Sequence, residues 1–596
     1  MKSWMEQARQ MLQHHFGYDS FRNGQAQIIQ QTLQGQSSLC VMPTGGGKSI
    51  CYQIPALMLE GLTLVISPLI SLMQDQVEAL RAANIPAAYI NSTLSVQEVD
   101  ETMQLASAGY LKLLYIAPER LESATFLQAL SYLSVPLLAV DEAHCISQWG
   151  HDFRPSYRAI QKLFTLWPQK PTVLALTATA TPAVCEDIRQ LLEIDEQSAV
   201  ITGFARDNLA FSVLIGENKE RYIKNYLTKN KLEAGIIYAA TRKAVDAIYD
   251  VLSRSGESVA KYHAGLAEEM RMSEQERFLK DEARIMVATN AFGMGIDKSN
   301  VRFVIHYQMP RNMESYYQEA GRAGRDGLPS ACILLYASGD VQTQRFLIEQ
   351  TQDASRITQE LVKLQTMVDY CHTEGCLQNA ILLYFGEKAG EPCGRCGNCN
   401  DGREVKDVTV DAQKVLACVV RMGQKFGKTM VAQVLIGSKN QKMTEFGFAR
   451  LSTYGILKGQ YSSKDVSSFI EFLIAEGLLA VKHGTYPTIY VSEEGKAVLL
   501  GNRKVMRKEA VIVRKLADND PLFEHLRVLR KQIADEEQVP PFVVFSDKTL
   551  RELCEQKPME LDGLRRVSGI GEVKFEKYGK RFFEALQSFL TEASNI

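Results

Sequence analysis

The chain has 596 residues, of which 46% are hydrophobic and 23% charged, a globular composition in a chain too long to fold around one core. Its 67 basic and 69 acidic residues leave a net charge of −2, so any site for a polyanion must be local. No apolar run is long enough to span a membrane, and residues 1–6 lack an apolar signal core. These features predict a cytoplasmic protein.

Two series of apolar runs alternate with amphipathic helical stretches, which is typical of parallel sheets covered by helices on both faces. The first series comprises Leu39–Met42, Leu62–Ser67, Leu111–Ala117, Leu137–Val140 and Val173–Thr177. The second comprises Ala234–Ala239, Val259–Tyr262, Ile285–Ala288, Val301–His306 and Ala331–Tyr336. We therefore predict two α/β domains in tandem, at residues 1–204 and 205–338.

A glycine-rich turn between the first apolar run and the next helix is typical of a phosphate-binding loop. The glycines at 45–47 allow successive backbone N–H groups to face one anion, and the next helix adds its positive N-terminal end. Lys48 can reach the β- and γ-phosphate oxygens, and the Ser49 hydroxyl can bind Mg²⁺. The usual spacing is broken in one place, because Met42 occupies the position of the first glycine.

Two adjacent carboxylates, Asp141 and Glu142, follow the apolar run Leu137–Val140, at the strand end where α/β proteins place catalytic groups. Asp141 would orient the Mg²⁺ that bridges the β- and γ-phosphates, and Glu142 would polarise the attacking water. The sequence DEAH begins at Asp141, several strand–helix units after Lys48. This separation favours an ATPase over an ordinary acidic loop.

The alternation of strands and helices stops after Tyr336. Residues 339–385 are expected to be helical, and residues 386–403 to form a polar loop rich in glycine and cysteine. Residues 408–500 have the pattern of a compact α+β unit. A basic segment at 501–515 then leads to a helical C-terminal region.

Four cysteines around this loop have the spacing of a metal site. Cys393, Cys396 and Cys399 bring three thiolates together in a Gly-rich turn, and Cys376 lies 17 residues before Cys393. Four sulfurs with no open position describe a closed structural site for Zn²⁺, although an iron–sulfur cluster also uses four cysteines. Cys371, five residues before Cys376, is an alternative fourth ligand.

Further motifs follow in a known order: Phe16-Gly17-Tyr18, Phe21-Arg22, Gln25, Ser67-Pro68-Leu69, Thr177-Ala178-Thr179, Tyr262–Gly265, Gly293–Asp297 and Gln318–Arg325. Together they strongly resemble a superfamily 2 helicase, and specifically the RecQ family of DNA helicases, over nearly the whole chain. The discriminating stretch is residues 144–157, HCISQWGHDFRPSY, an aromatic loop directly after the DEAH sequence that RNA helicases with the same sequence do not carry.

The resemblance implies an α/β fold of two RecA-like parallel-sheet motor domains followed by three smaller parts. These are a zinc-binding helical module at 339–405, a winged-helix domain at 406–500 and, after the basic linker at 501–515, a small helical HRDC domain at 516–596. It also favours zinc over an iron–sulfur cluster, and Cys376 over Cys371.

By the same resemblance, Tyr18 and Arg22 sandwich the adenine of ATP. Arg325 is the expected arginine finger and Arg322 a supporting contact. Three residues apart, the two arginines would face the same side of a helix that lines the cleft between the motor domains. The expected nucleotide site comprises Tyr18, Arg22, Gln25 (which reads the adenine edge), Thr44, Gly45, Gly46, Gly47, Lys48, Ser49, Asp297 and Gln318.

The aromatic loop is the first expected DNA contact. Trp149 and Phe153 can stack on unpaired bases, while Arg154 and His151 are candidates for phosphate contacts. Because the loop starts at His144, base contact could be transmitted to the catalytic carboxylates. The alternative is a hydrophobic plug under the cleft.

The C-terminal parts supply the other expected contacts. Residues 480–491 have the pattern of a β-hairpin, which by the resemblance lies near the duplex junction with His483 or Tyr486 stacking on the terminal base pair. Four basic residues of the HRDC domain either meet phosphates or form a solvated helix face: Lys574, Lys577, Lys580 and Arg581.

The resemblance implies an ATP-dependent 3′–5′ DNA helicase of recombination, repair and the response to DNA damage, using ATP, Mg²⁺ and Zn²⁺. Its expected substrates are single-stranded, duplex and forked DNA. It would be a cytoplasmic, nucleoid-associated monomer, with single-stranded-DNA-binding protein as a candidate partner. Two rivals are a DEAH-type RNA helicase and a zinc-dependent DNA-binding protein whose ATPase only switches its affinity.

Overall fold

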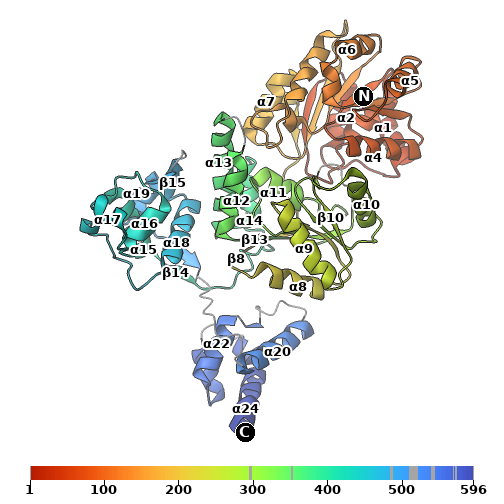
Figure 1. Cartoon of the computed structure of the whole chain (residues 1–596). Coiled ribbons are helices and arrows are strands. Elements are labelled where there is room, and N and C mark those ends of the chain that lie inside the picture. The colour runs from red at the N-terminus through yellow and green to blue at the C-terminus, as the bar shows by residue number, and fades with distance from the viewer. Residues whose placement is uncertain are drawn as a thin grey trace. The chain divides into compact units, whose positions relative to one another are not determined.

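The computed structural model describes residues 2–293, 298–350, 354–482, 487–508, 521–537, 544–545, 547–567, 570 and 574–594. The chain divides into two compact units, one made of Met1–Asn400 and Val410–Arg503 and the other of Asp401–Thr409 and Lys504–Ile596. Figure 1 labels the elements of both. In the described part of the chain, no helix has the length and apolar composition that a membrane span requires.

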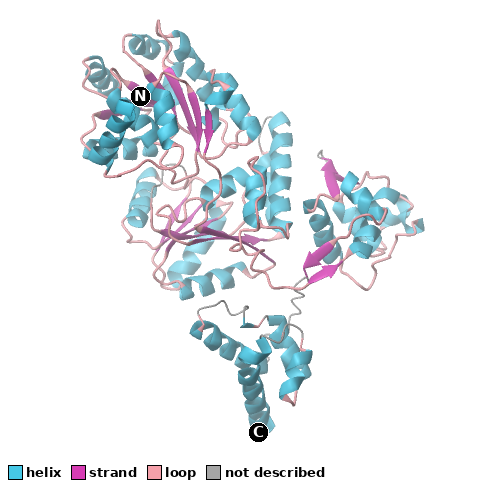
Figure 2. Cartoon of the chain, turned by 180° about the vertical axis from the view of Figure 1, so that it is seen from behind, coloured by secondary structure: helices cyan, strands magenta, loops and turns pink. Residues whose placement is uncertain are grey.

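The first α/β domain is built on a parallel sheet in the order β3-β4-β2-β5-β6-β1-β7. Helices cover the sheet (Figure 2), so its central strands are buried along their whole length and form apolar runs. The strands are β1 Ser38–Val41, β2 Thr63–Ile66, β3 Ala87–Ile90, β4 Leu113–Ile116, β5 Leu137–Val140, β6 Thr172–Thr177 and β7 Ala199–Ile201. The α-helices are α1 Lys2–Phe16, α2 Gln25–Leu33, α3 Ile50–Met58, α4 Ile70–Ala82, α5 Val96–Ser107, α6 Ala124–Ser131 and α7 Pro182–Leu192.

The second α/β domain has a parallel sheet in the order β10-β11-β9-β12-β13-β8. The five apolar runs predicted in each domain all form strands, so the prediction of two tandem parallel-sheet domains is confirmed. The strands are β8 Leu209–Ile215, β9 Ala234–Tyr238, β10 Val259–Tyr262, β11 Ile285–Ala288, β12 Val301–His306 and β13 Ser330–Tyr336. The α-helices are α8 Lys219–Lys229, α9 Arg242–Arg254, α10 Glu268–Leu279 and α11 Met313–Ala320.

Three helices and an irregular loop follow the second sheet, as predicted. The helices are α12 Ser338–Glu349, α13 Ala354–His372 and α14 Leu377–Tyr384. The α+β unit after them contains α15 Thr409–Arg421, α16 Lys428–Leu435, α17 Gln441–Glu445, α18 Ser463–Ala475, α19 Glu493–Leu499 and the antiparallel pair β15 Leu479–Lys482 and β16 Thr488–Val491. The predicted hairpin is therefore present, while its tip with His483 and Tyr486 lies outside the described residues.

The second compact unit pairs β14 (Val405–Asp407) with β17 (Met506–Lys508), so part of the predicted basic linker is a strand. Its helices include α20 Pro521–Glu536, α22 Asp547–Gln556 and α24 Lys580–Ser594. Two of its basic side chains form ion pairs across the domain: Lys577 Nζ lies 2.6 Å from Glu537, and Arg581 lies 2.5 Å from Glu536. These pairs favour the solvated-face alternative for both residues.

Candidate active site

The phosphate-binding loop connects β1 to α3 and takes a path that only glycine follows without strain. Gly45 and Gly47 have φ of +83° and +77°, in the left-handed region. A Cβ placed on Gly47 would lie 2.5 Å from Gln25 Nε2. That amide group donates to the carbonyl oxygens of Gly46 (3.2 Å) and Gly47 (2.9 Å). The Gln25 side chain therefore supports the backbone conformation of the loop.

Two of the three residues predicted to hold adenine, Arg22 and Gln25, lie beside this loop. The Arg22 guanidinium donates to the Gly45 carbonyl, and the Arg22 N–H donates to Gln25 Oε1 at 2.8 Å. Tyr18 is 52% exposed, so its ring is open to solvent. The structure therefore places Arg22 and Gln25 at the loop, bonded to its backbone, while Tyr18 lies exposed four residues before Arg22.

The two carboxylates at the end of β5 have different environments. The Glu142 N–H donates to Asp141 Oδ1 at 3.0 Å, and Glu142 has a left-handed φ of +46° that turns the chain sharply after the strand. Burial and the charge of Glu142 raise the pKa of Asp141 to about 7, against the opposing effect of Lys48. A half-buried carboxylate close to a lysine is suited to hold a divalent cation.

His144 connects these carboxylates to the second domain. Its Nδ1 lies 3.3 Å from Glu142 Oε2 and 2.9 Å from Thr177 Oγ1. Thr177 Oγ1 accepts a bond from the Thr179 N–H at 3.3 Å, and Gln318 Nε2 of the second domain donates to Thr179 Oγ1 at 2.9 Å. The predicted site residue Gln318 thus reaches Glu142 through side chains at the end of β6.

The prediction that Arg322 and Arg325 share one helix face is wrong. Helix α11 ends at Ala320, and both arginines lie in the turns that follow, where Gly324 has a φ of +60°. The turn still faces the phosphate loop. A Cβ placed on Gly45 would lie 3.6–3.7 Å from atoms of Arg325, while Arg322 is 6% exposed.

The aromatic loop combines an exposed and a half-buried ring. Trp149 is 51% exposed, and its carbonyl oxygen accepts a 2.6 Å bond from Lys363 Nζ on α13. Phe153 is half-buried, and the guanidinium groups of Arg158 and Arg356 lie 5.5 and 5.8 Å from its ring centre. The plug alternative does not fit Trp149, because a plug would be buried.

The polar residues of the loop are engaged within the protein. The His151 ring stacks on His144 with centroids 4.4 Å apart and planes 14° apart. Burial and His144 lower the pKa of His151 to about 4, so the ring is neutral near pH 7 and lacks the charge expected of a phosphate contact. Arg154 donates to Asp152 at 3.1 Å and to the Pro68 carbonyl at 2.8 Å.

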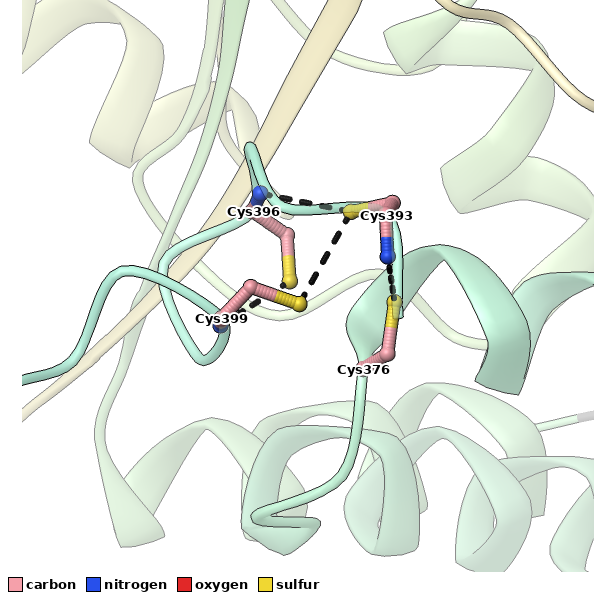
Figure 3. A group of neighbouring side chains, drawn as sticks. All are labelled: Cys376, Cys393, Cys396 and Cys399. Atoms are coloured by element: carbon pink, nitrogen blue, oxygen red, sulfur yellow. Dashed lines mark hydrogen bonds between the residues drawn. The ribbon is translucent and has the colours of Figure 1, made fainter. Parts of the chain in front are cut away.

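The four predicted cysteine ligands come together, with Sγ atoms all within 4.8 Å of one another (Figure 3). Cys376 precedes helix α14, and the other three lie in the Gly-rich loop. Burial would raise the pKa of Cys376, but N–H groups of Cys393 and Asn379 outweigh it and lower the pKa to about 7. These donors stabilise the Cys376 thiolate, whereas burial raises the pKa values of Cys393 and Cys399, whose deprotonation would accompany Zn²⁺ binding. Cys371 lies apart, in the hydrophobic core.

Two residues of the site carry no sequence motif. Lys363 contacts the aromatic loop, and its Nζ also lies 3.1 Å from Glu314 of α11. Arg206, between the two α/β domains, donates to backbone carbonyls on both sides. Neither contact could be predicted, because backbone acceptors have no residue signature.

Family models match consecutive parts of the chain. Their descriptions are DEAD/DEAH box helicase (residues 22–188), helicase conserved C-terminal domain (218–327), RecQ zinc-binding (338–400), RQC domain (402–515) and HRDC domain (519–586). The chain is also 56% identical over 586 residues to the "ATP-dependent DNA helicase RecQ" of Bacillus subtilis, covering 98% of this chain and 99% of that protein. The chain belongs to the RecQ family.

More distant RecQ proteins match over the same extent. The chain is 40% identical to the RecQ protein of Haemophilus influenzae, and the match covers 99% of this chain and 97% of that protein. It is also 40% identical to the RecQ protein of Pasteurella multocida, and that match covers 96% of this chain and 92% of the other protein. The RecQ zinc-binding match includes the whole four-cysteine cluster, so the predicted metal is zinc and not an iron–sulfur cluster. Asp297 of the expected RecQ nucleotide site lies outside the described residues.

Proposed function

We propose that this RecQ-family chain is an ATP-dependent DNA helicase that moves 3′ to 5′ on single-stranded DNA and unwinds duplex and branched DNA in recombination, repair and replication-fork maintenance. The observation that carries the proposal is the meeting of two domains at one phosphate loop, where the turn with Arg325 lies against Gly45. A nucleotide bound there draws the domains together, and hydrolysis releases them. The names of the relatives support the same activity.

In this proposal the hydrolysis step uses residues from both domains. Lys48 binds the β- and γ-phosphate oxygens, and Ser49 and Asp141 hold Mg²⁺, which neutralises phosphate charge. Glu142 orients and polarises the attacking water. Arg325 stabilises the charge that develops on the transferred group. The proximity of the Arg325 turn to the loop and the half-buried position of Asp141 at the end of β5 support these roles.

The remaining nucleotide contacts select ATP. Tyr18 and Arg22 flank the adenine, and Gln25 reads its edge while bracing the loop. Arg322 supports the finger from its buried position in the same turn. The exposure of the Tyr18 ring supports a stacking site, because a base can reach the ring from solvent.

DNA acts on this site through the aromatic loop. Trp149 stacks on an unpaired base, with Phe153 and Arg154 completing the contact. The stacked rings of His151 and His144, and the 3.3 Å approach of His144 to Glu142, form a continuous route from loop to carboxylate. In the winged-helix domain, His483 or Tyr486 acts at the duplex junction.

Strand displacement separates this proposal from its rivals. Duplexes with 3′ or 5′ tails, loaded on DNA or RNA, are incubated with ATP and the wild-type chain. We expect displacement only from 3′-tailed DNA. Equal displacement on RNA would indicate an RNA helicase, and ATP turnover without displacement would indicate a DNA-binding protein with an ATP switch.

Two variants test the assigned residues. Lys48→Ala and Glu142→Gln should each lower ATP turnover by about 100-fold or more, while single-stranded DNA affinity stays mostly intact. Glu186→Gln, which changes an exposed ion pair with Arg189, is the matched control. ATPase activity like the wild type in either active-site variant would contradict its role.

The oligomeric state, the location, the protein partner and the domain boundaries are also proposals. We propose a monomer in the cytoplasm that associates with the nucleoid and with single-stranded-DNA-binding protein. The domain boundaries proposed from the sequence are 1–204, 205–338, 339–405, 406–500 and 516–596, with the linker at 501–515.

A further inference from the structure

Arg206 lies in the segment between β7 and β8 that joins the two α/β domains, and its guanidinium contacts both of them. Nη1 donates to the carbonyl oxygen of Thr44, in the phosphate loop, at 2.7 Å. Nη2 donates to the carbonyl oxygens of Gly324 at 3.1 Å and Ala323 at 3.3 Å. One side chain therefore spans from the phosphate loop to the residues immediately before Arg325.

The geometry of these contacts requires a guanidinium. Its N–H groups form a planar fork, so two nitrogens can serve acceptors on opposite sides, whereas an ammonium is a compact point charge. Asn208, two residues later, reinforces the arrangement, because its Nδ2 donates to the carbonyls of Gly324 (2.7 Å) and Leu328 (3.0 Å). The joining segment thus fixes the finger turn from two positions.

The zinc-binding module holds the joining segment in place. The Phe204 N–H donates to Glu387 Oε1 at 2.6 Å, and the Phe204 ring stacks on Phe385 with centroids 4.3 Å apart. Arg395, between two of the zinc ligands, donates to Asp207 Oδ1 at 2.7 Å. The backbone on either side of Arg206 is therefore anchored to the module.

We infer that Arg206 is a positioning residue for ATP hydrolysis. It holds the finger turn against the phosphate loop, so that Arg325 reaches the transferred phosphoryl group, and the zinc-binding module fixes the backbone from which it acts. The inference rests on the proposed ATPase activity. We expect Arg206 to affect turnover more than binding, because its bonds go to carbonyl oxygens, whereas in the proposed site backbone N–H groups of the loop and Lys48 hold the phosphates.

The first test measures DNA-stimulated ATP turnover in Arg206→Gln and Arg206→Lys. We expect kcat to fall by about 10- to 100-fold in Arg206→Gln, because small displacements of a catalytic group have effects of this size. The KM for ATP should change by less than about threefold. The kcat of Arg206→Lys should fall by nearly the same factor, because lysine keeps the positive charge but lacks the planar set of N–H donors. Arg302→Gln is the matched control, since Arg302 pairs with Asp326 of the same turn at 2.7 Å without reaching the phosphate loop.

The second test asks whether Arg206 acts through Arg325. In an Arg325→Ala background, Arg206→Gln should lower kcat by less than about twofold, because residues that act as a unit are not additive. Three outcomes would each overturn the inference. The first is that the losses in kcat of Arg206→Gln and Arg325→Ala multiply in the double variant. The others are a rise in KM at unchanged kcat, and a loss of kcat in Arg302→Gln equal to that in Arg206→Gln. A wild-type chain without DNA-stimulated ATPase would instead overturn the proposed function itself.

Discussion

Replacing Trp149 with alanine should separate DNA sensing from DNA binding. The main chain holds the loop in place, since the Trp149 N–H donates to Ser147 Oγ at 3.1 Å and its carbonyl oxygen accepts from Lys363. The variant keeps both bonds. Because the indole is 51% exposed, its removal should also leave little cavity, and the melting temperature should stay close to that of the wild type.

The expected loss of affinity is limited. One base stacked on an aromatic ring contributes about 1–3 kcal/mol, so losing it weakens single-stranded DNA binding by at most about 5- to 160-fold, and by less where phosphate contacts dominate. The stimulation of ATP turnover by DNA should fall by a larger factor than the affinity, because the ring proposed to sense the DNA is gone.

The measurement is ATP turnover with and without single-stranded DNA, beside a binding titration at fixed salt. Turnover is measured at DNA concentrations that saturate each variant. Trp4→Ala is the matched control, because Trp4 is 48% exposed on α1, outside the loop. If Trp149→Ala keeps full stimulation at saturating DNA, the loop does not sense DNA and the proposed route is refuted.

Two further predictions concern the parts that follow the motor domains. We expect the wild-type chain to hold one Zn²⁺ tightly and Cys396→Ala to be protease-sensitive and to lack the metal, because thiolate ligation couples metal binding to folding. Protease digestion, thermal melting and elemental analysis test this. A normal melting temperature or a wild-type zinc content in Cys396→Ala would count against the site. Glu471 of α18 lies 2.9 Å from His372 of α13 and also pairs with Lys428. Burial would raise the pKa of Glu471, but His372 and Lys428 lower it to about 2. Glu471→Gln should therefore cost about 3 kcal/mol of unfolding free energy at pH 7, most of it lost as the pH falls from about 4.5 to 2. Urea titrations test this, with the exposed Glu493→Gln as control; equal losses in both variants would refute it.

How well the sequence predicted a strand depended on where the strand lies in its sheet. Central strands such as β5 are buried on both faces, and continuous apolar runs identify them. Of the four strands at the edges of the two parallel sheets, β10 is among the predicted runs, whereas β3, β7 and β8 are not. β3 begins with two alanines, β7 has three residues, and β8 is buried only at alternate positions near its start.

The residues of the candidate active site also differ in how far the sequence could predict their positions. Lys48 lies in the loop after β1, and Asp141 and Glu142 directly follow β5, as the apolar runs predict, while the catalytic roles of all three stay predictions. The four cysteines could be predicted because metal ligation requires sulfur at fixed spacing. The positions of Arg322 and Arg325 in turns after α11 could not be predicted, because a helical spacing of two residues does not tell where the helix ends.

His144 shows how the parts of the site can communicate. Burial lowers the pKa of His144 to about 4, as it does that of His151, so the two stacked rings are neutral near pH 7. In the proposed coupling, a change at the aromatic loop would therefore reach Glu142 as a displacement of packed rings and not as a change of charge. The same His144 nitrogen contacts Thr177, from which bonds lead to Gln318 in the second domain. His144 contacts His151 of the loop, Glu142 and Thr177, so in the proposed mechanism a movement that DNA imposes on the loop would act on the attacking water and on the domain contact together.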